Sequence, residues 1–148
     1  MKRHAQGLTL IELMVVVGII AILATVAMVS WGNYVRRSAR SDAMAALMDL
    51  RVKQERYRFT SPSYANRVQY SSVFQPAGDP LPALSPNRKY LIDVATASVT
   101  GFTATATPQG SQDSQAERDE CGGSAIFAVN QEGPVMGGAY ASAGCWKR

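Results

Sequence analysis

A short polar peptide, residues 1–7 (MKRHAQG), precedes one long apolar stretch. Residues 13–29 carry no charged side chain, and Glu12 is the one charge between residues 8 and 31. As a helix, residues 13–29 would span about 25 Å, slightly less than a hydrocarbon core of about 30 Å. Counting from Leu8 to Trp31 makes the segment long enough to cross. We predict one membrane-capable helix over residues 8–31.

The helical pattern continues beyond the apolar stretch. Residues 30–59 contain no proline and one glycine, Gly32. Met44, Leu47, Leu50 and Tyr57 recur at helical spacing, which predicts a face that packs on a core. The segment TSPSY ends this pattern, because the residue before Pro62 disfavours the helical conformation. We therefore predict one helix from Leu8 to about Phe59, spanning a membrane in its first half and amphipathic in its second.

The period changes from helical to alternating after residue 88. Residues 64–86 look like a loop, and QPAGDPLPALSP holds four of the seven prolines. KYLIDVAT and VTGFTATAT then alternate apolar and polar positions, and SAIFAVNQEGPVMGGAY predicts two strands around an NQEG turn. Strands without intervening helices favour an antiparallel meander. The predicted fold class is α+β: a long N-terminal helix packed on a small antiparallel sheet of three or four strands.

The net charge gives little reason to expect a nucleic-acid-binding protein. The formal net charge is +4, and it falls to +2 without Lys2 and Arg3, since 13 basic and 11 acidic side chains then remain. We interpret the basic residues after the apolar stretch as a solvated helix face rather than a nucleic-acid site; they are Arg36, Arg37, Arg40, Arg51, Lys53, Arg56 and Arg58. We do not expect nucleic acid as a partner.

The segment QGSQDSQAERDECGG, residues 109–123, is acidic. Its carboxylates, Asp113, Glu117, Asp119 and Glu120, do not have the spacing of an EF-hand calcium loop. We predict an exposed acidic loop and no metal site. The one histidine, His4, lies in the leading peptide, and the serine-hydrolase, zinc-protease and P-loop motifs are absent. We predict no catalytic residues and no cofactor.

The two cysteines, Cys121 and Cys145, both follow the membrane-capable segment. An even pair in a chain with an export or membrane signal predicts a disulfide in an oxidising compartment. Lys2 and Arg3 ahead of an apolar stretch also fit a cleaved secretory signal. However, this stretch is long and no A-x-A-like cleavage site follows it, so we favour a retained anchor.

The N-terminus resembles that of type IV prepilins and pseudopilins, which carry a class III leader. In that pattern a short basic leader ends in glycine and precedes a Phe-Thr-Leu-Ile-Glu start and an apolar helix. Here Gly7 matches the last leader residue, Leu8 the first mature residue and Glu12 the glutamate five residues in. The C-terminal layout and the ending GCWKR are most similar to PilE-type minor pilins, which implies a type IV pilin fold.

The resemblance implies a processing pathway and a location. A prepilin peptidase would cleave between Gly7 and Leu8, and the new terminus at Leu8 would be N-methylated. Residues 1–7 would then be the leader, 8–31 the transmembrane and filament-core helix, and 32–148 a periplasmic pilin domain. The protein would lie in the inner membrane before assembly and in a pilus on the cell surface afterwards. Its partners would be the peptidase, other minor and major pilins, and a tip adhesin.

The resemblance also gives Glu12 a role. After cleavage the amine of Leu8 is a cation, and Glu12 is its natural counter-charge, in the same subunit or in a neighbour of a staggered filament. Alternatively, Glu12 lies at the membrane interface and its carboxylate reaches water.

Two departures from the family pattern bear on the type of pilin. Leu8 replaces the usual phenylalanine but is still bulky and apolar, so we still expect cleavage. Val29 stands where many major pilins have a helix-breaking proline, which favours a minor pilin that primes pilus assembly and sits in a tip complex. The alternatives are a type II secretion pseudopilin, a DNA-binding pilin of an uptake system, and a bitopic protein that carries the motif by chance.

Overall fold

The computed structural model describes residues 9–75 and 81–147. The chain separates into two compact units, the first ending at Val35 and the second beginning at Arg36, and each is described by itself. Helix α1, Leu10–Arg58, runs through both units without a break, including at residue 29. The predicted long helix is therefore confirmed.

In the first unit, α1 exposes its large apolar side chains along its length. Ile11 and Ile22, for example, are 71% and 68% exposed. Among the described residues, α1 is long and apolar enough to cross a membrane: its most apolar window has a mean hydropathy of 2.7, and none of that window is buried. The hydroxyl of Thr25 donates to the carbonyl of Ile22 (2.7 Å), so this polar group is satisfied within the helix.

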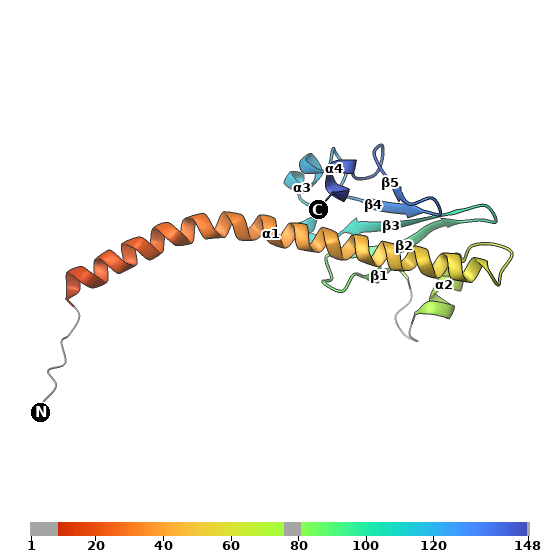
Figure 1. Ribbon diagram of the computed structural model, residues 1–148, viewed down its shortest axis with the longest axis horizontal. Helices are drawn as coiled ribbons and strands as arrows, with labels where there is room; N and C mark the ends of the chain where they lie inside the picture. The colour runs from red at the N-terminus through yellow and green to blue at the C-terminus, as the bar shows by residue number, and fades with distance from the viewer. Residues whose placement is uncertain (1–8, 76–80, 148) are drawn as a thin grey trace, which may run out of the picture. The chain divides into compact units, whose positions relative to one another are not determined.

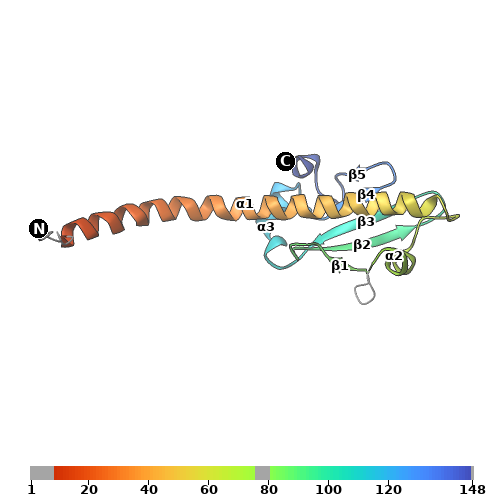
Figure 2. The same ribbon diagram turned by 60° about the horizontal axis from the view of Figure 1, so that its bottom comes forward.

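In the second unit, the remainder of α1 packs across a five-stranded antiparallel sheet (Figures 1 and 2). The strands follow one another in chain order: β1 (Ala83–Leu84), β2 (Tyr90–Ala97), β3 (Phe102–Pro108), β4 (Phe127–Asn130) and β5 (Pro134–Val135). Sequential antiparallel strands need only short connections, as the alternating segments predict. The predicted α+β class and antiparallel meander are confirmed, with β1 as an unpredicted edge strand.

The two central strands bury alternate side chains, as predicted. Tyr90, Ile92 and Val94 of β2 are buried, and in β3 the buried positions are occupied by Phe102, Ala104, Ala106 and Pro108. The two strands pair with Ile92 opposite Ala106, and the register shifts between Val94 and Thr96. From α1, the core receives Ala39, Ala43, Leu47 and Leu50.

Four short helical segments complete the second unit: α2 (Arg67–Phe74), the 3-10 turn η1 (Gly110–Gln112), α3 (Gln115–Glu120) and α4 (Ala143–Trp146). Two predictions are therefore wrong in part. Residues 64–86 include helix α2, which Asn66 caps by accepting the N–H of Gln69. Residues 109–123 are not simply an exposed acidic loop, because they form η1 and α3 and bury Glu117 completely.

Candidate functional site

The predicted processing site, Gly7 and Leu8, lies outside the described residues, so its cleavage and methylation stay predictions. The described structure begins immediately after it, at Thr9, and α1 starts at Leu10. His4 of the leader also lies outside the described residues.

Glu12 lies in the first turn of α1 and is exposed. Its backbone N–H donates to the hydroxyl of Thr9 (3.3 Å). Thr9 thus occupies the N-cap position and Glu12 the third helical position, the spacing of a capping box. A carboxylate there also interacts favourably with the positive end of the helix dipole. Glu12 therefore has a local role in starting α1, in addition to the predicted pairing with the Leu8 amine.

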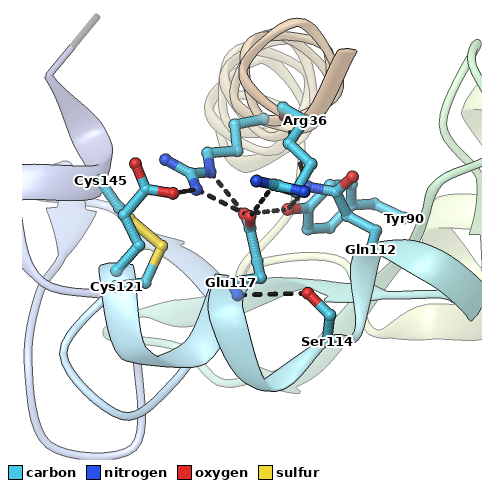
Figure 3. A network of polar contacts seen from close by, with 9 residues as sticks. Arg36, Tyr90, Gln112, Ser114, Glu117, Cys121 and Cys145 are labelled. Atoms are coloured by element: carbon cyan, nitrogen blue, oxygen red, sulfur yellow. Dashed lines mark hydrogen bonds and ion pairs between the residues drawn. A yellow bond between two sulfur atoms is a disulfide. The ribbon is translucent and has the colours of Figure 1, made fainter. Parts of the chain in front are cut away.

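A buried polar network joins α1 to α3 in the second unit (Figure 3). The guanidinium of Arg40 donates to both carboxylate oxygens of Glu117, with one N···O distance of 2.7 Å, and also to Glu120. Arg36 lies 3.9 Å from the Glu117 carboxylate. Arg40 is 6% exposed and Glu117 is fully buried. Burying either charge alone would be costly, so each requires the other.

Tyr90 and Gln112 extend this network toward the sheet. The amide of Gln112 donates to the Tyr90 hydroxyl (3.3 Å), and that hydroxyl lies 3.5 Å from the Glu117 carboxylate (Figure 3). Burial raises the pKa of Tyr90 above its ordinary value. The hydrogen bond from Arg40 lowers the pKa of the Glu120 carboxyl. In turn, the hydrogen bonds to Glu117 and Glu120 raise the pKa of the Arg40 guanidinium.

Cys121 and Cys145 form a disulfide, the pairing that the sequence predicts. Cys121 is the C-cap of α3, and Cys145 lies in α4. The bond thus joins α3 to the C-terminal segment. Both cysteines are buried, and the neighbouring Trp146 ring contacts Phe127 edge-on at a centroid distance of 5.3 Å.

The network corrects two interpretations of the sequence. Arg40 does not belong to a solvated face, because it lies on the buried side of α1. Glu117 is not an exposed loop residue. The sequence indicates where each residue lies, but not their contact. Arg40 is spaced with Ala43, Leu47 and Leu50 on the core face, and Ser114 with Glu117 has the spacing of a capping box that starts a helix. Ser114 does cap α3, accepting the N–H of Glu117 (3.2 Å).

Comparison with protein families identifies this architecture. The family described as "Type IV minor pilin ComP, DNA uptake sequence receptor" matches residues 30–124, well over half of the chain. The chain belongs to this family of type IV minor pilins. The prokaryotic N-terminal methylation motif matches residues 2–28. The predicted resemblance to type IV pilins is thereby confirmed.

Curated relatives match a shorter part of the chain. Prepilin peptidase-dependent protein D of Escherichia coli K12 is 44% identical over 50 residues, which is 34% of each chain. The type IV major fimbrial protein FimA of Dichelobacter nodosus is 46% identical over 55 residues, or 37% of this chain and 35% of FimA. Fimbrial protein EcpC of Eikenella corrodens is 49% identical over 43 residues, or 29% of this chain and 28% of EcpC. The matches cover about a third of each relative's length.

Proposed function

We propose that this minor pilin is cleaved after Gly7, N-methylated at Leu8 and incorporated into a type IV pilus, where it primes assembly as part of a tip complex. The observation that carries the proposal is the exposed apolar surface of α1 in the first unit, none of which is buried within the chain. Such a surface needs an apolar environment. A membrane can supply it before assembly, and the helices of other pilins can supply it in a filament.

The proposal includes an orientation. Residues 8–31 would form the membrane and filament-core helix, with residues 32–148 in the periplasm. The disulfide between Cys121 and Cys145 supports this orientation, because disulfides persist in oxidising compartments. The unbroken course of α1 through residue 29 supports a minor pilin rather than a subunit whose helix is broken there.

The test of incorporation is intact-mass measurement of this protein recovered from sheared pili. We expect a chain that begins at Leu8 and carries one added methyl group. A Gly7 variant with a bulkier side chain should stay uncleaved and be absent from pili. A species that still begins at Met1 in pili would refute the processing step, and absence of the wild-type protein from pili would refute incorporation.

The tip position is tested separately. Immunogold labelling of the periplasmic domain should mark pilus ends, and cross-linking should recover other minor pilins and the tip adhesin. Labelling along the whole filament would contradict a tip role while leaving incorporation intact.

DNA uptake is a second candidate function, and the family's description favours it. Near the end of α1, a hollow of about 420 Å³ is lined by Arg51, Val52, Glu55, Arg56 and Phe59. Phe59 is 90% exposed. An exposed aromatic ring beside arginines combines a stacking surface with phosphate-binding charge, the two features typical of nucleic-acid sites. We propose this hollow as the DNA contact of this chain.

The DNA proposal is tested on the mature chain in neutral lipid nanodiscs. Genomic DNA fragments should bind, and Arg56→Gln should weaken binding and reduce the salt slope by about one. Phe59→Ala should weaken binding while the salt slope stays unchanged. Arg67→Gln is the matched control, since Arg67 is paired with Asp93 elsewhere on the domain. Binding that is the same in all variants would refute this site.

A further inference from the structure

A set of cations lies at the end of the second unit where α1 enters it. Arg36 and Arg40 face the carboxylates of Glu117 and Glu120, and Arg118 pairs with Asp113. Within the described residues, no carboxylate forms an ion pair with four further basic side chains, which we call the basic collar: Arg37, Arg88, Lys89 and Lys147. Lys89 is half-buried, and the other three are exposed.

Hydrogen bonds hold the β1–β2 turn of the collar against the start of α1 in this unit. The backbone N–H of Asn87, next to Arg88, donates to the Asp42 carboxylate (3.0 Å). The carbonyl of Lys89 accepts the N–H of Gln109 (2.8 Å), three residues before Gln112, whose side chain reaches the carbonyl of Arg36. The turn is thus positioned by residues 36–42 of α1.

The C-terminal segment is held at the same end. Lys147 follows α4, which the disulfide joins to α3, and α3 is held by Arg40 through Glu117. Figures 1 and 2 show the β1–β2 turn and the C-terminal segment on different sides of this part of α1. The collar segments therefore lie on two sides of the helix rather than along one face.

In the sequence, Arg37 of the collar comes shortly after the end of the apolar stretch. Trp31 and Tyr34 are 69% and 66% exposed, and their ring centroids are 6.1 Å apart. Tryptophan and tyrosine are enriched at membrane–water interfaces. Arg37 follows Trp31 by six residues in the sequence.

We propose that, before assembly, the basic collar binds an anionic phospholipid surface through the headgroup phosphates. The inference rests on the membrane anchoring that we propose for the first unit. Lysine and arginine near the membrane are attracted by anionic lipids, and salt screens this attraction. Carboxylates offset part of this charge, since Asp42 also lies on α1 and Glu120 of α3 interacts electrostatically with Arg37. Extraction of the subunit into a pilus would break these contacts.

Lysine reactivity tests the proposal, because after leader removal the chain has three lysines: Lys53, Lys89 and Lys147. The mature chain is placed in nanodiscs of phosphatidylcholine alone or mixed with phosphatidylglycerol, and lysine acetylation is followed by mass spectrometry. We expect Lys89 and Lys147 to react about fivefold more slowly in the anionic discs, the effect of one cation at such a surface. High salt should remove the difference. Lys53, which pairs with Asp49 on α1, should react equally in both.

Variants separate the collar from a general charge effect. Arg37→Gln with Arg88→Gln should reduce the protection of Lys89 and Lys147, whereas Arg56→Gln with Arg58→Gln, at the other end of this part of α1, should not. Equal acetylation of Lys89 in the two kinds of disc would overturn the proposal.

Two other outcomes are informative. Protection of the collar lysines by added duplex DNA, but not by anionic lipid, would overturn the proposal in favour of a nucleic-acid site. Failure of the chain to enter nanodiscs would instead refute the anchoring on which the inference rests.

Discussion

Arg40 and Glu117 are 77 residues apart in the sequence and form a buried ion pair between α1 and α3. Arg40 comes from the face of α1 that packs on the sheet, and Glu117 from a helix that is closed at its end by the disulfide. The pair therefore connects the long N-terminal helix to α3, which the disulfide joins to the C-terminal segment.

Removal of Glu117 should destabilise the second unit strongly. Glu117→Ala leaves the guanidinium of Arg40 buried without its main partner, which costs about 3–5 kcal/mol in the free energy of unfolding. Chemical denaturation followed by circular dichroism measures this loss. The control is Glu132→Ala, at an exposed turn, which should change stability by less than about 0.5 kcal/mol.

The double variant Arg40→Met with Glu117→Leu distinguishes a broken pair from lost packing. Apolar replacements of similar volume should recover most of the stability lost in Glu117→Ala, because neither buried charge remains. If Glu117→Ala costs less than about 1 kcal/mol, the pair is not buried as described.

The same network predicts a dependence of stability on pH. The hydrogen bond from Arg40 holds the pKa of Glu120 below its ordinary value of 4.5. A lowered folded-state pKa contributes stability above the unfolded-state pKa, and that stability is lost as pH falls through the folded-state pKa. Unfolding midpoints should therefore decrease below about pH 4.5, and Glu120→Gln should flatten this decrease. If the unfolding midpoints of Glu120→Gln decrease below pH 4.5 as steeply as those of the wild type, the hydrogen bond between Arg40 and Glu120 does not contribute to stability.

Stability should also decrease at alkaline pH, because tyrosines are buried in the second unit. Burial raises the pKa of Tyr70 and Tyr90 above the ordinary value of 10. A raised folded-state pKa gives full stability below the unfolded-state pKa and loses it as pH rises through the folded-state pKa. Stability should therefore decrease above pH 10, and absorbance at the tyrosinate band should increase together with unfolding. Tyrosinate formation in the folded protein at pH 10 by all six tyrosines would contradict this burial.

Hydrophobic periodicity and residue spacing along the chain predict much of this fold. The long helix, the alternating faces of β2 and β3 and the disulfide were all predicted from such patterns. Helix α2 was missed because the prolines after it suggested a loop, although Asn66 and Gln69 have the spacing of a capping box. Edge strand β1 was missed because its two residues are too few to show an alternating pattern.

The buried network could not be predicted in the same way. A charge among helix positions is normally solvated, and an acidic segment is normally exposed. Arg40 and Glu117 are buried because the tertiary fold brings α3 onto α1, and their separation in sequence hides that contact. The capping spacing of Ser114 and Glu117 could have indicated α3, but not the burial of the carboxylate.

Gln54 should be important for the stability of the α1–α2 connection. Its fully buried side chain donates to the carbonyl of Ala65 (2.8 Å) and accepts its N–H (2.9 Å). Gln54→Ala leaves both backbone groups buried and unpaired, at about 1–3 kcal/mol each. Denaturation midpoints measure the loss, with Lys53→Gln on the more exposed side as the control. Equal stabilities of the two variants would contradict this role.

The disulfide should stabilise the second unit by restricting its unfolded state. Cys121 and Cys145 are separated by 24 residues, and a loop of this size contributes about 3.5 kcal/mol in the chain-entropy model. Replacing both cysteines by serine should lower stability by about 2–5 kcal/mol. Hydrogen exchange should increase most in α3 and α4, which the bond joins. The native protein should show no reactive thiol; two reactive thiols would contradict the bond.

We propose two roles for Glu12, and one substitution tells them apart. The structure gives it a place in the capping arrangement with Thr9, which glutamine also satisfies. The proposed pairing with the Leu8 amine requires the negative charge. Glu12→Gln should therefore keep leader cleavage and membrane insertion but reduce incorporation into sheared pili, and Thr9→Ala should weaken the cap with little loss of incorporation. Quantitative immunoblots of pilus and membrane fractions measure both. If Glu12→Gln enters pili at the wild-type level while Thr9→Ala does not, Glu12 acts through the helix start and not through its charge.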